Sequence, residues 1–174
     1  MNNNLIIVNL TRFIALFLMQ VLIFKRIALG WASFNYINIF IYPIFILLLP
    51  AELPVALGIG ISFLLGLCID TAYDSPGIHA GASVFSAYLR YYVLGFLEPK
   101  GGYPLNSGPT QFKLGVTWFL RYAAVFMLIH LFIYFSIEAF TFVYIVEILI
   151  RTFFSFIFSM LFVTMYQFLL DPKE

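Results

Sequence analysis

Several ionisable side chains of this chain fall within long apolar runs, where a charge needs a partner. Asp70 is the clearest case, because it stands near the end of the apolar run that begins at Val55. A carboxylate in lipid costs about 2.5–3.5 kcal/mol at mid-bilayer and less near the interface. Asp70 also falls at the predicted C-terminus of a helix, where the macrodipole disfavours an anion. We therefore expect this carboxylate to bind a specific partner.

The turn after Asp70 offers that partner. Ser75 is expected to cap the next helix, Pro76 to occupy its first turn and Gly77 to permit a close approach. The exposed N–H groups of a helix start, together with His79, form a site suited to a carboxylate. The sequence therefore predicts a helical hairpin whose two arms are joined through Asp70.

Small residues line both arms of this hairpin. Gly58, Ser62 and Gly66 recur at every fourth position before the turn, and Ser83 belongs to a similar series after it. On a helix this spacing places small residues along one face, which lets another helix approach closely. Two interpretations stay open: the hairpin is a docking surface for another protein, or the small residues only pack the helices of this chain together.

Several other polar residues lie within apolar runs. Three arginines are expected to extend toward lipid headgroups: Arg12, Arg90 and Arg121. Gln20 is expected to hydrogen-bond across helices. Glu147 and Arg151 stand four residues apart with the acid first, the favourable order for an ion pair on one helix. His130 is interpreted as a hydrogen-bonded packing residue.

The patterns that membrane-embedded catalysis requires are incomplete. Gly81-Ala82-Ser83 is similar to the GxS start of an intramembrane serine protease, but Val84 replaces the following glycine and the last apolar run contains no histidine. An aspartyl protease needs two facing acids, and Asp70 has no second aspartate on another apolar run. No metal cluster, phosphate loop or nucleotide motif is present. The sequence favours a non-catalytic protein without a cofactor.

The composition places the chain in a membrane. Its 174 residues are 63% hydrophobic and only 10% charged, whereas a soluble domain is about 45–50% apolar and about 25% charged. The net charge of +1 gives no basic patch for nucleic acid. The single cysteine, Cys68, excludes an intramolecular disulfide and a cysteine-rich metal site. Long apolar runs without alternation predict helices rather than a barrel.

A membrane span needs about 20 apolar residues, and about six such runs are present. We expect one all-α polytopic membrane domain over residues 1–174, a compact bundle with a retained first span and short links. The predicted spans are Leu5–Phe24, Asn38–Leu49 with some flank, Leu53–Thr71, Gly77–Leu97, Gly115–Glu138 and Phe142–Leu169.

The links between the predicted spans are mostly short. The longest, Glu98 to Lys113, is rich in glycine, proline, asparagine and serine and is predicted to be an exposed loop. The charges in the links predict the orientation of the chain in the membrane. Placing both termini in the cytoplasm puts Lys100, Lys113 and Lys173 on that side and leaves only Lys25 and Arg26 opposite. The positive-inside rule therefore favours cytoplasmic N- and C-termini.

The central hairpin carries a resemblance to a known family. The order Gly66-Leu67-x-x-Asp70, followed by Pro76-Gly77-x-x-Ala80, resembles the central hairpin of the rod shape-determining protein MreD family. The similar length, short ends and proline-containing link before the third span agree with that resemblance. The motif covers the hairpin, and the rest of the chain agrees in size and span pattern.

The resemblance implies a location, partners and a fold. MreD proteins are bacterial inner-membrane components of the machinery that elongates rod-shaped cells, and no catalytic activity is attributed to them. They associate with MreC, a bitopic protein, in a complex that connects MreB filaments with the RodA polymerase and its transpeptidase. Their fold resembles the substrate-binding subunit of energy-coupling-factor transporters. On this basis, the hairpin residues Gly58–Ser83 are expected to shape a surface for an MreC-type partner.

A transport function is the alternative. The fold analogy suggests a vitamin-type substrate-binding subunit, whose pocket would gather polar and aromatic groups at one membrane face. Candidate residues for such a pocket are Asn35, Asp70, Tyr73 and His79. The polar-poor spans and short links count against this alternative.

Overall fold

The computed structural model describes residues 3–30, 36–104 and 108–169. Every regular element in these ranges is helical. In chain order, the elements are α1 (Asn3–Met19), the π-helical turn η1 (Gln20–Phe24), α2 (Lys25–Gly30), α3 (Pro43–Leu48), α4 (Val55–Tyr73), α5 (Ile78–Phe96), α6 (Gln111–Leu114), α7 (Val116–Ala139), the 3-10 turn η2 (Phe142–Tyr144) and α8 (Ile145–Leu169).

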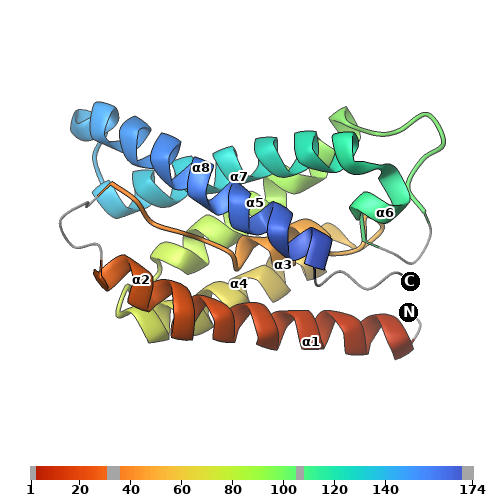
Figure 1. The fold of residues 1–174 in the computed structure, drawn as a ribbon, viewed down its shortest axis with the longest axis horizontal. Helices are drawn as coiled ribbons and strands as arrows, with labels where there is room; N and C mark the ends of the chain where they lie inside the picture. Colours follow the sequence, from red (N-terminus) through yellow and green to blue (C-terminus); the bar gives the residue numbers. More distant parts are fainter. Residues whose placement is uncertain (1–2, 31–35, 105–107, 170–174) are drawn as a thin grey trace.

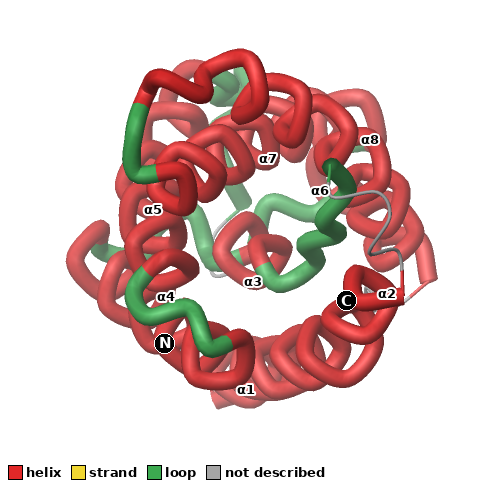
Figure 2. Tube along the Cα trace, turned by 90° about the vertical axis from the view of Figure 1, so that its left-hand side faces the viewer, coloured by secondary structure: helices red, strands yellow, loops and turns green. Residues whose placement is uncertain are grey.

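The long helices lie side by side along one axis and form a ring in cross-section (Figures 1 and 2). The short helix α3 lies in the middle of that ring (Figure 2). Helix α4 packs against α5, α5 against α7, and α7 against α8, so neighbours in sequence are neighbours in space. The start of α1 and the end of α8 lie at the same end of the bundle (Figure 1).

Four helical segments are long and apolar enough to cross a membrane. They are Ile6–Ile27, Val55–Tyr73, Val116–Ala139 and Ile145–Leu169. They contain or overlap four of the predicted spans, and they support the assignment of the chain to a membrane. Helix α5 has 19 residues and matches the predicted span Gly77–Leu97 closely, but it is more polar and does not reach the same hydropathy.

The predicted span Asn38–Leu49 is wrong as a membrane-spanning helix. Only the six residues of α3 are helical there, and the chain before them carries no helix from residue 36 to residue 41. Every residue from Ile39 to Pro50 is buried. The apolar run faces other helices rather than lipid, and hydropathy alone does not distinguish these two environments.

The predicted exposed loop from Glu98 to Lys113 is also partly wrong. Its first part is exposed at Lys100 and Gly101, but Gly108–Gln111 is buried. The backbone of Gly108 lies directly against the carbonyl of Leu48, so a side chain has no room there. The loop thus returns to cover the end of α3, and the short helix α6 follows it into α7.

Candidate functional site

Asp70 binds the start of α5. Its Oδ1 accepts the N–H of His79 at 2.9 Å, and its Oδ2 accepts the N–H of Gly77 at 3.1 Å and of Ala80 at 2.9 Å. The Ser75 hydroxyl adds a bond to Oδ1 at 3.0 Å. The predicted pairing of this carboxylate with the next helix start is therefore confirmed. The buried anion faces N–H groups that no helical carbonyl can satisfy.

The side chain of His79 also contacts Asp70. Its Nδ1 lies 3.0 Å from Asp70 Oδ1 and 2.9 Å from Ser75 Oγ. Because Asp70 is an acceptor, Nδ1 carries the proton in the neutral ring and Nε2 is left as an acceptor. The His79 side chain is fully buried, and its Nε2 has no hydrogen-bond partner within the described residues.

The local structure of the turn differs from the prediction at two residues. Helix α5 begins at Ile78, with Gly77 as its N-cap, so Pro76 precedes the helix instead of occupying its first turn. Ser75 makes no side-chain cap and binds Asp70 instead. Gly77 has φ +85° and open space around a notional β-carbon, so it supplies backbone conformation rather than a close approach.

The small residues of the hairpin do not all serve the same purpose. A β-carbon on Gly66 would lie 2.5 Å from Cα and 2.7 Å from N of Ala80, so this glycine lets the two backbones touch. Gly58 has ordinary space around it. Ser62 and Ser83 are fully buried. The structure therefore brings Gly66, Asp70, Gly77 and His79 into one cluster, in which Gly77 is exposed and the other three are buried inside the bundle.

A second polar site supports the non-helical chain before α3. Gln20, in the π-helical turn η1, accepts the N–H of Ile41 at 2.8 Å and of Tyr42 at 3.3 Å through Oε1. Its Nε2 donates to the carbonyl of Ile39 at 3.1 Å. One side chain thereby replaces the bonds that a helix or sheet would provide. Its Nε2 also donates to the Tyr73 hydroxyl of α4 at 2.8 Å, which confirms the prediction that Gln20 hydrogen-bonds across helices.

Helix α8 supplies two further acceptors for the same segment. Ser155 Oγ accepts the N–H of Asn38 at 3.0 Å, and Ser159 Oγ accepts the N–H of Phe40 at 2.9 Å. Non-helical backbone at membrane depth is tolerated only where protein satisfies it. Both serines were missing from the sequence prediction. Their four-residue spacing within the otherwise apolar stretch Phe153–Val163 is the signal that identifies them.

Side chains from α5 and α7 hydrogen-bond the C-terminal end of α3. The Tyr122 hydroxyl donates to the carbonyl of Leu47 at 3.0 Å, and the Arg90 guanidinium donates to the carbonyl of Leu49. These are carbonyls at the end of α3, where no helical N–H is available. Arg90 is buried, so the prediction that it extends to lipid headgroups is wrong.

His130 joins α7 to the centre and to α5. Its Nε2 lies 2.8 Å from the Tyr42 hydroxyl, and its Nδ1 lies 2.9 Å from Ser86 Oγ. The residue is fully buried. Both ring nitrogens are used in internal bonds, which confirms the interpretation of His130 as a hydrogen-bonded packing residue.

The predicted ion pair on the last helix has a third member. Arg151 binds Glu147 at 3.1 Å on its own helix and Glu138 of α7 at 2.9 Å. The i, i+4 pairing predicted from sequence is therefore confirmed. The bond to Glu138 ties the end of α7 to the start of α8, across the connection that contains η2.

A polar cavity of about 350 Å³ lies beside the Asp70 cluster. Its walls come from η1 and α2, the chain before α3, the α4–α5 turn and the end of α7. The polar and aromatic residues that line it are Lys25, Asn38, Phe40, Tyr73, Ser75, His79, Tyr134 and Glu138. Tyr73 and His79 were predicted to share a pocket. Asn35 lies outside the described residues.

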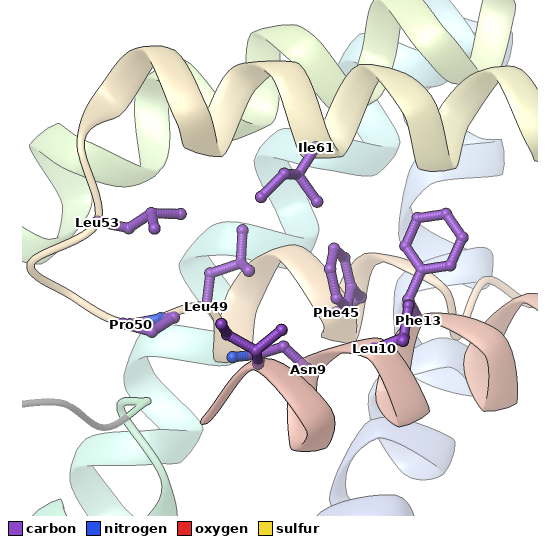
Figure 3. Close-up of a pocket in the computed structure, with 9 residues that line it drawn as sticks. Asn9, Leu10, Phe13, Phe45, Leu49, Pro50, Leu53 and Ile61 are labelled. Carbon is purple, nitrogen blue, oxygen red and sulfur yellow. The ribbon is translucent and has the colours of Figure 1, made fainter. Parts of the chain in front are cut away.

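An apolar pocket of about 190 Å³ opens between α1, α3 and α4. Figure 3 shows Leu10 and Phe13 on one side, Ile61 on the facing helix, and Phe45 and Leu49 between them. Its lining is almost entirely carbon. Leu10 is itself 59% exposed on the outer surface of α1.

Comparisons with known proteins add no assignment: no family model, no curated protein and no solved structure matches this chain.

Proposed function

We propose that this chain is a non-catalytic membrane scaffold of the MreD type, whose apolar helix surfaces bind a bitopic partner of the MreC type. One observation carries the proposal. The buried polar groups described above bind the chain's own backbone and side chains, while α1 and α4 expose many large hydrophobic side chains. A protein built this way meets a partner within the lipid bilayer through helix packing.

Internal use of the polar groups also supports a non-catalytic function. His130, which lies in the apolar helix α7, binds Tyr42 and Ser86 rather than Ser83. Asp70 accepts four hydrogen bonds from the turn and the start of α5, plus the contact with His79. Neither group is left exposed in the position of a nucleophile or general base for a substrate.

The face formed by α1 and α4 is the proposed docking surface. Leu10 of α1 and Leu57 and Leu64 of α4 are each more than half exposed. The apolar pocket of about 190 Å³ lies between the same two helices. This volume suits one large aliphatic or aromatic side chain of a partner's single span, which would dock as a knob into a hole. Gly66 and Asp70 fix the position of α4 from inside.

The proposed membrane arrangement has about six crossings. Helix α5 and the chain from residue 36 to α3 would add two to the four apolar helices. A broken crossing enclosed by five long helices satisfies the requirement that its backbone be paired within the protein. The proposed location is the bacterial inner membrane, with both termini cytoplasmic, within the complex that contains the RodA polymerase and its transpeptidase. The likeness to the energy-coupling-factor fold belongs to the same proposal.

Cysteine cross-linking tests the docking surface directly. Cys68→Ala removes the only cysteine and gives a background for single replacements. Leu10→Cys on the proposed surface is compared with Phe153→Cys, which is equally exposed at 59% but lies on α8. Each is co-expressed with the MreC-type protein of the same genome, carrying single cysteines along its span.

Cross-links from Leu10→Cys and none from Phe153→Cys would support the proposal. Equal cross-linking at both positions would show contact without a specific surface. The absence of cross-links at both positions, with both proteins present in the membrane, would exclude this partner at this face. Cell shape on depletion of the chain gives an independent readout of the elongation function.

The polar cavity beside His79 favours a second candidate function, a small-molecule-binding membrane subunit. Its volume of about 350 Å³ falls within the range of ligand pockets, roughly 300–1,000 Å³. Polar and aromatic groups converge on it from four parts of the chain. Co-purification with an ATPase and a coupling subunit, in place of an MreC-type protein, would favour this candidate.

A further inference from the structure

We propose that the cavity between Lys25, Tyr73, His79 and Tyr134 binds a small aromatic monoanion that carries a hydrogen-bond donor. The inference does not depend on the scaffold function. It supplies the ligand class for the second candidate function, and it stands on the unpaired nitrogen of His79, the charge of Lys25 and the rings around them.

His79 sets the requirement for a donor. Its Nδ1 is engaged with Asp70 and Ser75, so the ring is fixed with Nε2 as an acceptor. This nitrogen is buried and has no partner within the described residues, and His79 is one of the residues that line the cavity. A buried acceptor without a bond is costly, and an N–H or O–H group of a ligand would satisfy it.

Lys25 sets the requirement for an anion. Its ammonium group donates to the carbonyl of Ala72 and lies 5.3 Å from the centre of the Tyr73 ring. It forms no ion pair with a carboxylate of the described chain. Glu138 also lines the cavity, but it is bound to Arg151 at 2.9 Å. Arg151 also binds Glu147, so Lys25 is the group of the cavity lining that would bind an anionic ligand.

The rings set the requirement for a flat apolar body. The centres of Tyr73, Tyr134 and Phe40 lie 5.0, 4.9 and 6.0 Å from that of His79. Ring contacts at these separations favour edge or offset packing with another aromatic group. A cavity of about 350 Å³ accommodates one ring with two substituents and excludes large cofactors.

Three probes separate these requirements. 4-Hydroxybenzoate has the ring, the anion and an O–H donor, benzoate lacks the donor, and phenol lacks the anion. Binding is measured by calorimetry on the full chain in lipid nanodiscs. We expect a Kd of about 1 mM or lower for 4-hydroxybenzoate. Each control is expected to bind about tenfold more weakly, because one polar interaction is lost.

Variants connect the binding to the cavity. Lys25→Met is expected to weaken 4-hydroxybenzoate about tenfold and to abolish its advantage over phenol, whereas Lys25→Arg retains the charge and should retain binding. Lys113→Met changes an exposed lysine at the other end of the bundle and serves as the matched control. Thermal unfolding of each variant separates loss of binding from loss of fold.

A spectroscopic readout avoids changing His79, whose bonds hold the turn. On binding, the ¹⁵N signal of His79 Nε2 should shift as this nitrogen accepts a hydrogen bond, while Nδ1 stays unchanged. Equal affinity for the three probes, unchanged affinity in Lys25→Met, or a His79 signal that does not move at saturation would each overturn the proposal.

Discussion

The backbone of Ala80 occupies the place where a β-carbon of Gly66 would lie, with separations of 2.5 Å to Cα and 2.7 Å to N. This contact joins α4 to α5 one helical turn before Asp70. It sets the distance at which the Asp70 carboxylate meets the N–H of the same Ala80, 2.9 Å away. Close packing of glycine and the buried hydrogen bonds therefore depend on each other.

Gly66→Ala should destabilise the protein by about 3 kcal/mol or more, because the new methyl group meets backbone rather than a side chain that can move. Gly60→Ala is the matched control on the same helix, since nothing lies within 4 Å of its notional β-carbon. That change should be neutral or stabilise α4 by up to about 1 kcal/mol. Thermal unfolding in detergent measures both, and equal midpoints would contradict the close contact.

Asp70→Asn should cost about 2–4 kcal/mol of unfolding free energy at nearly unchanged volume. The amide NH₂ group replaces one carboxylate oxygen, so at least one of the N–H groups of Gly77, His79 and Ala80 faces a donor instead of an acceptor. Asp74→Asn is the control, because Asp74 is exposed and has φ +54°, a conformation that asparagine adopts readily. Denaturant unfolding distinguishes them, and a similar small loss in both variants would refute the cluster's importance.

Ser159→Ala should destabilise the bundle by about 1–3 kcal/mol, because it leaves the N–H of Phe40 buried without an acceptor. Ser136→Ala removes the same hydroxyl from α7, where it binds only the carbonyl of Phe132 in its own helix. That loss should stay within about 0.5 kcal/mol. Hydrogen exchange at Phe40 reports the effect at the site and should accelerate in the first variant alone.

Tyr103 should add a pH dependence at high pH. Burial raises the pKa of its hydroxyl from 10.0 to about 12, with smaller contributions from Tyr122 and Glu98. The hydroxyl donates to the carbonyl of Leu94 at 2.8 Å, so the folded state favours the protonated form. Its contribution to stability is complete below pH 10 and is lost as the pH rises through about 12.

Ultraviolet titration of tyrosinate, compared with Tyr103→Phe, measures this pKa. In the variant, one fewer tyrosine should titrate late. The free energy of unfolding of the variant should also fall less between pH 10 and about pH 12 than that of the unchanged protein. Titration of Tyr103 at its ordinary pKa in the folded protein would contradict the bond to Leu94.

The sequence predicted the α4–α5 hairpin and the partner of Asp70 because both are local. A helix end, a turn and a helix start follow one another within ten residues, and backbone geometry determines which N–H groups are free. Two details of the predicted turn were wrong. Ser75 and Pro76 fit standard helix-start preferences, but the buried Asp70 already satisfies those N–H groups, so α5 begins later, after Gly77.

The centre of the bundle was decided by tertiary structure. The run Asn38–Leu49 is as apolar as a span, because lipid and a protein interior select the same side chains. Only the assembled helices reveal that it is enclosed, and that Gln20, Ser155 and Ser159 satisfy its backbone from 19 to 119 residues away along the chain. Local composition determined that this protein belongs in a membrane and forms a hairpin around Asp70. Long-range hydrogen bonds determined that the long helices enclose the segment Asn38–Leu49.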